Sequence, residues 1–202
     1  STLHVQSIQL DEWAEQLISD FKPEASVRGI TLVYQPEPEI QTLCFDKEKC
    51  TTILTNLLIN ALKYTPDEST ISISTRLSED RTRVRISISD QGPGLKDVDT
   101  NLFVRFYQGN NSRPGTGIGL SYSKILVEQH GGNIGAYDNK NFGSPGATFW
   151  FELPLNTEPG NITLHPQEYL NTLLAPTQET ESIPEQQEEN KTAPSHTLLI
   201  VD

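Results

Sequence analysis

The chain has 202 residues and a formal net charge of -12, and 35% of its residues are hydrophobic. This length fits one domain of ordinary size, and no stretch approaches the run of about 20 apolar residues in a membrane helix or the pattern of a signal peptide. The acidic balance argues against a nucleic-acid-binding protein, which needs a basic surface. Cys44 and Cys50 are the only cysteines, so we expect reduced packing residues in a cytosolic compartment.

The first elements in chain order are a strand, a helix and a second strand. Apolar alternation predicts a short strand over residues 5–10. Asp11 is a preferred N-cap residue, and residues with helical spacing follow it at Trp13, Leu17, Ile18 and Phe21. Residues 30–34 are typical of a further strand.

A second helix is predicted from its N-cap Asp46 to about Tyr64, with Pro66 just beyond its end. Each residue advances about 100° around a helix. One broad arc is therefore apolar and is formed by Ile53, Leu54, Leu57, Leu58, Ala61 and Leu62. This arc is expected to face the core.

Three polar residues of this helix, Asn56, Asn60 and Lys63, fall within about 60° of one another on another side. Amide oxygens are hard ligands, and Mg²⁺ usually takes one or two protein ligands with phosphates and waters completing its shell. The ridge therefore suits a hydrated Mg²⁺ ion and phosphate oxygens. Taken alone, an ordinary solvated helix face is the more common explanation.

A strand pair over residues 71–77 and 84–90 leads to a glycine segment, in which Gly92 and Gly94 follow Asp90. A carboxylate at a strand end can accept a hydrogen bond from the amino group of adenine, and glycines let the backbone approach. Guanine carries a carbonyl at that position and would be rejected, because two acceptors would face each other. The alternative is a plain loop after a strand.

A third helix is predicted over residues 116–130, closed by the pair Gly131-Gly132. Two last strands follow over residues 134–137 and 147–153. Helices and strands do not alternate strictly. This order favours an α/β sandwich, with a mixed sheet covered on one face by about three helices.

The third helix opens with the segment Gly115, Thr116, Gly117, Ile118, Gly119 and Leu120. Free backbone N–H groups and the positive dipole end of a helix favour phosphate there. The segment follows a polar loop rather than a strand and lacks the Lys of a P-loop, so it fails both common nucleotide fingerprints. Arg113 in the preceding loop suits a lid cation near a terminal phosphate; an ordinary surface loop is the alternative.

The composition changes after Leu155. Prolines and glutamates crowd residues 156–195, which predicts an extended interdomain linker. Residues 198–201 are apolar again, as at the start of a buried strand.

Four segments occur in an order that is more specific than any one of them: residues 56–66 (NLLINALKYTP), 90–95 (DQGPGL), 102–107 (LFVRFY) and 115–120 (GTGIGL). They resemble the N, G1, F and G2 boxes of sensor histidine kinases, in the GHKL family with the Bergerat fold. Residues 146–154 look like the closing strand. The resemblance covers about residues 1–155 as the catalytic ATP-binding domain.

The resemblance implies that this domain binds ATP with Mg²⁺ under a mobile lid. Asn60 would coordinate Mg²⁺, Asn56 and Lys63 would contact phosphates, and Arg113 would serve as the lid cation. The implied nucleotide-contacting residues are Asn60, Tyr64, Asp90, Gly92, Gly94, Phe106, Gly115, Thr116, Gly117, Ile118, Gly119, Leu120 and Thr148. Among these, Asp90 would read the adenine amine and Thr148 would lie near its water network.

Asn56 separates two branches of the family. In the related gyrase, chaperone and mismatch-repair ATPases, a glutamate one turn before the metal-binding asparagine activates water. An amide cannot act as a general base near neutral pH, so transfer to a histidine is favoured over hydrolysis. Val104, where the F box commonly has an acid, favours the alternative of a degenerate nucleotide-binding or interaction module.

The four histidines of the chain are His4, His130, His165 and His196. None of them has the sequence context of a phosphoacceptor. We therefore expect the acceptor on a dimerisation domain outside this chain. Residues 196–202 resemble the first strand of a receiver domain, which suggests a hybrid kinase. The implied partners are the dimerisation domain and a receiver or response regulator, with no direct nucleic acid. The parent protein is expected to be a dimer anchored in a bacterial inner membrane, with this part in the cytoplasm.

Overall fold

The computed structural model describes residues 2–95, 102–104 and 118–164. The first half contains strand β1 (Thr2–Gln9), helix α1 (Leu10–Val27), strands β2 (Thr31–Gln35) and β3 (Thr42–Asp46), and helix α2 (Lys47–Tyr64). The second half contains β4 (Thr70–Leu77), β5 (Arg83–Ser89), helix α3 (Gly119–Gln129), β6 (Asn133–Asp138), the 3₁₀ turn η1 (Asn139–Phe142), β7 (Ala147–Pro154) and β8 (Gly160–Thr163).

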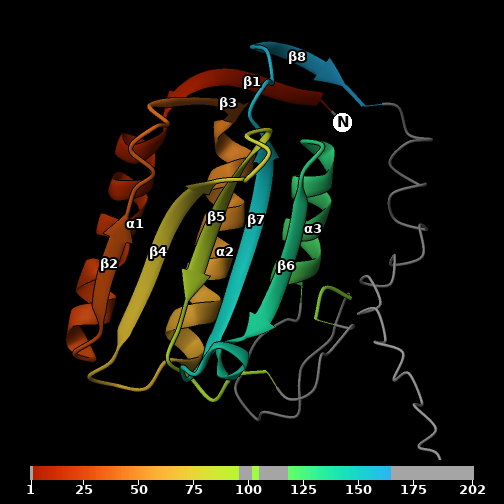
Figure 1. The fold of residues 1–202 in the computed structure, drawn as a ribbon. Coiled ribbons are helices and arrows are strands. Elements are labelled where there is room, and N and C mark those ends of the chain that lie inside the picture. Colours follow the sequence, from red (N-terminus) through yellow and green to blue (C-terminus); the bar gives the residue numbers. More distant parts are fainter. Residues whose placement is uncertain (1, 96–101, 105–117, 165–202) are drawn as a thin grey trace, which may run out of the picture.

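Five strands form the main sheet in the order β2-β4-β5-β7-β6. The β2–β4 pair is parallel, and the other pairs are antiparallel. Helices α1, α2 and α3 lie side by side on one face of this sheet, with α2 in the middle (Figure 1). The structure confirms the predicted α/β sandwich, a mixed sheet covered on one face by three helices in the described part of the chain.

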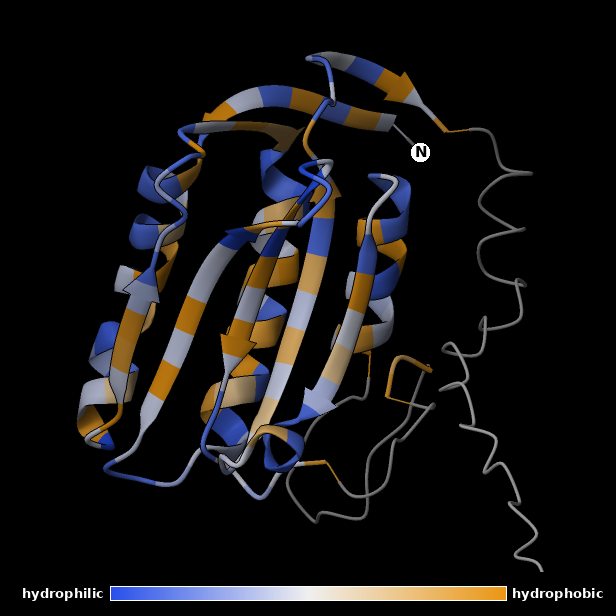
Figure 2. Cartoon of the chain, in the orientation of Figure 1, coloured by the Kyte–Doolittle hydropathy of each residue, from blue (hydrophilic) through white to orange (hydrophobic). Residues whose placement is uncertain are grey.

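Side-chain alternation explains why the helices cover only one face. Val84, Ile86 and Ile88 of β5 are buried against the helices, whereas Arg85 and Ser87 point to the opposite face. The strands of Figure 2 show this apolar and polar alternation. A slip by one residue would turn the buried side chains outward, so the pattern fixes the register of β5 against its neighbours.

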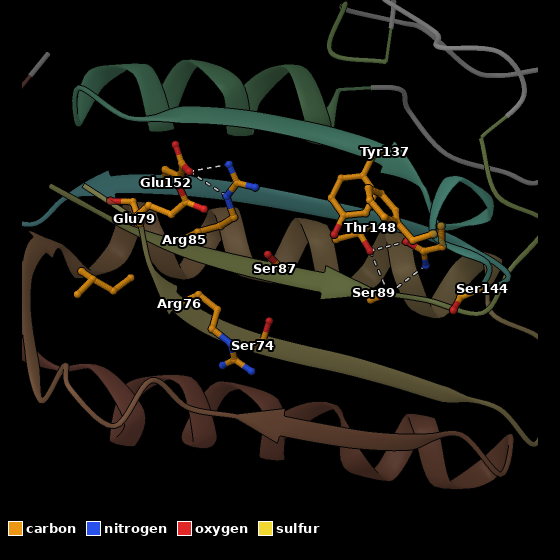
Figure 3. Close-up of a pocket in the computed structure, with 14 residues that line it drawn as sticks. Ser74, Arg76, Glu79, Arg85, Ser87, Ser89, Tyr137, Ser144, Thr148 and Glu152 are labelled. Atoms are coloured by element: carbon orange, nitrogen blue, oxygen red, sulfur yellow. Dashed lines mark hydrogen bonds and ion pairs between the residues drawn. The ribbon is translucent and has the colours of Figure 1, made fainter. Parts of the chain in front are cut away.

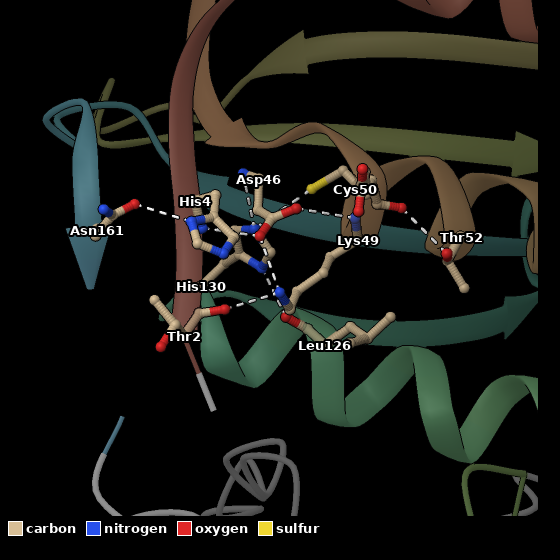
Figure 4. A network of polar contacts seen from close by, with 10 residues as sticks. Thr2, His4, Asp46, Lys49, Cys50, Thr52, Leu126, His130 and Asn161 are labelled. Atoms are coloured by element: carbon tan, nitrogen blue, oxygen red, sulfur yellow. Dashed lines mark hydrogen bonds and ion pairs between the residues drawn. The ribbon is translucent and has the colours of Figure 1, made fainter. Parts of the chain in front are cut away.

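A second, three-stranded sheet of order β3-β1-β8 crosses one end of the molecule (Figure 1). Its centre is tied to the helices by a polar network around Asp46 (Figure 4). Asp46 Oδ2 accepts a hydrogen bond from the backbone N–H of His4 at 2.9 Å, and the ammonium of Lys49 lies 2.9 Å from the same oxygen. His130 Nε2 accepts the backbone N–H of Asp46 at 3.2 Å. The network thus joins β1 to the start of α2 and the end of α3.

The predicted second helix is confirmed at both ends. Asp46 is its N-cap, with Oδ1 accepting the backbone N–H of Lys49 at 3.1 Å, and the helix ends at Tyr64. The third helix begins at Gly119 within the described residues, and Gly131 and Gly132 follow its end. Cys44 and Cys50 are free thiols, as predicted. No helix of the described segments is long and apolar enough to cross a bilayer.

Three expectations need correction. Asp11 does not cap α1, because the helix begins at Leu10 and the Asp11 carboxylate accepts the Tyr34 hydroxyl at 2.7 Å instead. Strand β3 was not predicted. Strand β8 lies inside residues 156–195, which composition predicted to be linker, and it pairs with β1. All four residues of β8 are exposed, so it has no burial pattern that could reveal it. Residues 165–202, including the predicted receiver-like strand, lie outside the described residues.

Candidate nucleotide-binding site

Helix α2 presents the predicted polar ridge next to the start of α3. The side-chain amide of Asn56 donates hydrogen bonds to the backbone oxygen of Gly119 at 3.2 Å and to Ser123 Oγ at 3.1 Å. A Cβ on Gly119 would lie 3.6 Å from the Asn56 side chain, which is ordinary contact. The predicted phosphate-binding helix start and the polar ridge are therefore neighbours, although they are 63 residues apart in sequence.

Further along α2 lie Asn60, Lys63 and Tyr64, all partly exposed. The Asn60 amide makes no hydrogen bond with another described residue, so its oxygen is available to a ligand. The Lys63 ammonium lies 5.0 Å from the centre of the Tyr64 ring, a distance at which the cation and the ring attract each other. A hard amide oxygen and a cation therefore stand one turn apart on this helix.

The end of α2 is held in place by Arg28. Its guanidinium donates to the backbone oxygens of Leu62 and Thr65, the latter at 2.6 Å, and pairs with Asp67 at 2.8 Å. A cation at the carboxyl end of a helix satisfies open carbonyl groups and complements the helix dipole. This contact fixes the last turn of α2, where Lys63 and Tyr64 stand.

Asp90 stands immediately after β5 and is only 4% exposed. Its Oδ1 accepts the backbone N–H groups of Gly92 at 2.8 Å and Ala147 at 3.2 Å. Burial raises the pKa of this carboxyl, the two N–H groups oppose the shift, and the negative charge of Asp138 adds to it. No donor among the described residues reaches Oδ2, so this oxygen can accept a hydrogen bond from a ligand.

Gly92 brings the Asp90 end of β5 against the end of α2. A Cβ at Gly92 would lie 2.8 Å from the backbone oxygen of Tyr64 and 2.9 Å from Asp90 Oδ1. Gly94 has a φ of +80°, and a Cβ there would lie 2.6 Å from Asp138 Oδ2. Gly92 is therefore required by close approach of backbone, and Gly94 by its left-handed backbone conformation. The structure therefore places the Asp90 segment against the carboxyl end of α2, at Tyr64.

Thr148 lies elsewhere than predicted. It is opposite Ser89 in the register of β5 and β7, and its hydroxyl lies 3.0 Å from Ser89 Oγ and 2.6 Å from Asn139 Oδ1. These contacts are on the open face of the sheet (Figure 3). Successive side chains of a strand point to opposite faces, so Ala147 takes the position beside Asp90. Thr148 does not contact Asp90 with its side chain.

The remaining predicted residues divide by position. Ile118 is 44% exposed just before α3, and Leu120 packs partly against the core. Val104 is 53% exposed. Five predicted residues lie outside the described residues: Phe106, Arg113, Gly115, Thr116 and Gly117. The sequence analysis did not identify Gly146, Ala147 and Asn139, which all contact Asp90. The glycine before Ala147 could have indicated a close approach of the backbone there.

The donor set fits a nucleotide with a metal held mainly by phosphate. No group of three or more His, Cys, Asp or Glu residues in the described segments could hold a metal ion by itself. Mg²⁺ seldom uses such a cage and takes one or two protein ligands beside the phosphates, so Asn60 alone is a sufficient protein ligand. Asp90, with Oδ2 available and glycines on its wall, fits the amino edge of a purine.

A hollow of about 670 Å³ lies on the open face of the main sheet, away from this site (Figure 3). Polar side chains dominate its lining, and Arg85 pairs with Glu152 across it at 2.7 Å. It contains Thr148 but neither Asn60 nor Asp90. The chemistry of the α2–β5 site, rather than this hollow, fits a nucleotide.

The fold and the site together define a Bergerat-type nucleotide-binding domain. Its features are a mixed sheet with three helices on one face, a central helix that carries amide side chains, and a buried carboxylate followed by two glycines. The family model for the histidine kinase-, DNA gyrase B- and HSP90-like ATPases matches residues 45–157. The chain belongs to this family, and within it the chain is an ATP-binding catalytic domain of the sensor histidine kinase type.

Curated relatives are sensor kinases much longer than this chain. WalK of Bacillus subtilis is 37% identical over 119 residues, or 56% of this chain and 19% of the relative. TmoS of Ectopseudomonas mendocina is 34% identical over 179 residues, or 80% of this chain and 18% of the relative. VanS of Enterococcus faecium is 35% identical over 157 residues, or 76% of this chain and 39% of the relative. The chain thus spans well under half of these relatives.

Solved structures of histidine kinases share the fold. The nucleotide-free catalytic domain of ThkA superimposes with a TM-score of 0.65 at 25% identity, covering 75% of this chain and 97% of that one. Full-length ShkA, solved in complex with AMPPNP, gives a TM-score of 0.67 at 28% identity, covering 78% of this chain and 32% of that one.

Proposed function

We propose that this chain is the catalytic part of a two-component sensor histidine kinase that transfers the γ-phosphate of MgATP to a histidine of a dimerisation domain outside the chain. The observation that carries the proposal is the meeting of the Asp90 segment with the carboxyl end of α2, the helix that bears Asn60 and Lys63, at Gly92. One site thereby combines a reader of the purine with ligands for metal and phosphate.

The residues of the site have separate tasks. Asp90 accepts the adenine amino group at Oδ2, Asn60 holds the Mg²⁺ ion, and Lys63 neutralises phosphate charge. Bound MgATP supplies the phosphoryl group that can be transferred. Arg113, Phe106 and the glycines before α3 keep the lid and phosphate roles that the resemblance implies. Positioning and charge stabilisation are the main contributions that a protein makes to phosphoryl transfer.

Transfer to a protein group is supported over hydrolysis by Asn56. Its amide is engaged as a donor to Gly119 and Ser123, and an amide nitrogen or oxygen has no useful basicity near neutral pH. Water in the site therefore has no general base at this position. A positioned imidazole of the dimerisation domain is itself nucleophilic and needs none.

The partners and the cellular setting follow from the kinship with sensor kinases. We infer a dimeric parent protein anchored in a bacterial inner membrane, with this domain on the cytoplasmic side. A receiver domain or response regulator takes the phosphoryl group from the histidine, and residues 196–202 are the start of an attached receiver. Residues 165–195 link the two domains.

Equilibrium binding of ATP and GTP, with and without Mg²⁺, tests the site. We expect the chain to prefer ATP and Asp90→Asn to weaken ATP binding by at least about tenfold, because an amide offers a donor where an acceptor is needed. Asp20→Asn changes an exposed carboxylate on α1 and is the matched control. If the native chain binds neither nucleotide, the alternative of a degenerate interaction module replaces this proposal.

Reconstitution tests the reaction. The chain is joined to a histidine-containing dimerisation domain of its own parent protein and incubated with labelled MgATP. Phosphate should appear on the histidine, labile to acid and stable to base, and Asn60→Ala should abolish it. Release of inorganic phosphate without labelled protein would assign the chain to the hydrolysing branch of the family.

A further inference from the structure

We propose that Asn139, held by Thr148 from the open face of the sheet, is a positioning residue that fixes Asp90 for the selection of adenine. Asn139 opens the turn η1 between β6 and β7 and is 6% exposed. This inference rests on the proposed function, because it assigns Asp90 the task of reading the purine.

Asn139 is at the centre of a buried set of hydrogen bonds. Its side-chain nitrogen lies 3.2 Å from the backbone oxygens of both Asp90 and Pro145, and 3.0 Å from Ser89 Oγ. Its backbone N–H donates to the oxygen of Gly146 at 2.9 Å. One residue therefore ties the backbone at Asp90 to the chain that precedes β7.

This connection is important because the segment before β7 also holds the Asp90 carboxylate. The N–H of Ala147 donates to Asp90 Oδ1 at 3.2 Å, and the N–H of Asp90 donates to the oxygen of Ala147 at 2.9 Å. A Cβ on Gly146 would lie 1.9 Å from the Asp90 backbone oxygen. The two segments are in direct contact, so a shift of one rotates the carboxylate of Asp90.

Thr148 supplies the donor that reaches the Asn139 amide oxygen. The backbone oxygens of Asp90 and Pro145 can only accept, so the amide nitrogen points toward them, and the Thr148 hydroxyl donates to the remaining Oδ1 at 2.6 Å. Figure 3 shows the neighbouring contact of Thr148 with Ser89. The resemblance implied that Thr148 lies near the water network of the adenine; in the structure its side chain connects to Asp90 through Asn139.

The polar groups that face Asn139 explain why a single hydroxyl has this effect. Asn139 Oδ1 accepts only from Thr148 within the described residues. Without that donor, the buried amide oxygen loses its partner, and a flip would only turn it toward the backbone oxygens of Asp90 and Pro145, which are acceptors too. The Asn139 side chain and the Asp90 segment tied to it would then shift to relieve the unsatisfied oxygen.

The test is nucleotide selectivity of the whole chain. Thr148→Val keeps the shape and removes the hydroxyl; we expect ATP affinity to fall about tenfold, equivalent to about 1.4 kcal/mol, and GTP affinity to change little. Thr148→Ser restores the donor and should restore selectivity. Asn139→Ala should give the same loss as Thr148→Val. Ser87→Ala lies in the same hollow, has no contact with Asn139, and should bind ATP as the native chain does.

The controls separate this inference from the proposed function. Suppose that the native chain binds ATP, that Asp90→Asn loses this affinity, and that Thr148→Val and Asn139→Ala both keep full selectivity. This result would overturn the role of Asn139 and leave the proposed function intact. Equal losses of ATP and GTP binding together with a lowered melting temperature would also overturn it, because they indicate a purely structural role. A native chain without ATP affinity removes the proposed function itself.

Discussion

Gly92 makes the closest approach between the two halves of the nucleotide site. Gly92→Ala places a methyl group 2.8 Å from the Tyr64 backbone oxygen and 2.9 Å from Asp90 Oδ1, where no atom can give way without moving α2 or the carboxylate. We expect ATP affinity to fall by more than about tenfold, measured by titration calorimetry. Pro93→Ala, at an exposed neighbour in the same loop, is the control. Equal affinity of the two variants would mean that the nucleotide does not use this wall.

Asp46 is a charged residue that stabilises the fold rather than the site. Burial alone would raise the pKa of this carboxyl, but hydrogen bonds from the backbone of His4 and from Lys49 together lower it to about 2. The folded state therefore favours the carboxylate over the free acid. A depressed acid pKa adds stability above the unfolded value near 3.8, and the gain is lost as the pH falls toward 2.

Asp46→Asn removes this charge with little change of shape. The difference between the two pKa values corresponds to roughly 2 kcal/mol, and we expect this loss in the free energy of unfolding at pH 7, measured with urea. Glu48→Gln, an exposed residue in the same helical turn, should change stability by less than about 0.5 kcal/mol. Similar effects of both variants would contradict the special role of Asp46.

At the same scale, the sequence placed Asp90, Gly92, Asn56 and Asn60 in motifs with local spacing, and the structure brings Gly92 against the carboxyl end of α2. The sequence analysis placed Thr148 on the wrong face. Adjacent residues of a strand point to opposite faces of the sheet. Whether Ala147 or Thr148 lies on the side of Asp90 therefore depends on which face of β7 meets the helices. Apolar side chains at both Phe149 and Trp150 left the alternation ambiguous.

At the scale of elements, the end of α3 shows two glycines needed for different reasons. Gly131 has a φ of +69°, and its N–H donates to the oxygen of Glu128, while the N–H of Gly132 donates to the oxygen of Val127. This is the Schellman ending of a helix. A Cβ on Gly131 would meet only Pro154, at 3.7 Å, whereas one on Gly132 would lie 2.0 Å from the Glu152 backbone oxygen.

The two alanine variants should therefore differ. Gly131→Ala costs the strain of a left-handed residue, about 1–2 kcal/mol. Gly132→Ala forces α3 away from β7, and we expect a loss above about 3 kcal/mol or no soluble protein. Thermal and urea unfolding of both variants gives the comparison. Gly132→Ala with native stability would show that α3 can shift freely against the sheet.

Elements with local signals were predicted well, and those that depend on distant pairing were not. Helix α2 has its cap, its apolar arc and a following proline within its own sequence. Strand β8 consists of four exposed residues and exists only because its backbone pairs with β1, about 158 positions earlier. Composition marked it as linker for that reason.

At the scale of the whole molecule, α2 and α3 connect the two ends of the domain. The Asn56 contact joins them at the nucleotide site, and the contact of His130 with Asp46 joins them at the small sheet (Figure 4). His130 Nδ1 lies 2.7 Å from the backbone oxygen of Leu126 and donates to it, so Nε2 must stay unprotonated to accept the Asp46 N–H. A protonated ring cannot make both contacts.

Stability should therefore fall in mild acid. Burial lowers the pKa of His130 below 6.5, the Leu126 carbonyl and the Asp46 charge partly offset this, and Lys49 adds to it. The adjacent Cys50 thiol stays neutral because burial raises its pKa. Below pH 6.5 the unfolded chain binds a proton that the folded chain resists, so stability is complete above that pH and declines below it by up to about 1.4 kcal/mol per unit.

Urea unfolding of the native chain at pH 7.5, 6.5 and 5.5 measures this decline, and His130→Gln removes the titrating group. The variant should be less stable at pH 7.5 but show a smaller loss between pH 6.5 and 5.5. Asp46 cannot account for the difference, because its carboxyl stays ionised until far lower pH. Asp90 has a raised pKa and would act in the opposite direction, since protonation relieves its burial. If the free energy of unfolding of His130→Gln falls with pH as steeply as that of the native chain, the acid sensitivity does not come from the junction of the small sheet with α2 and α3.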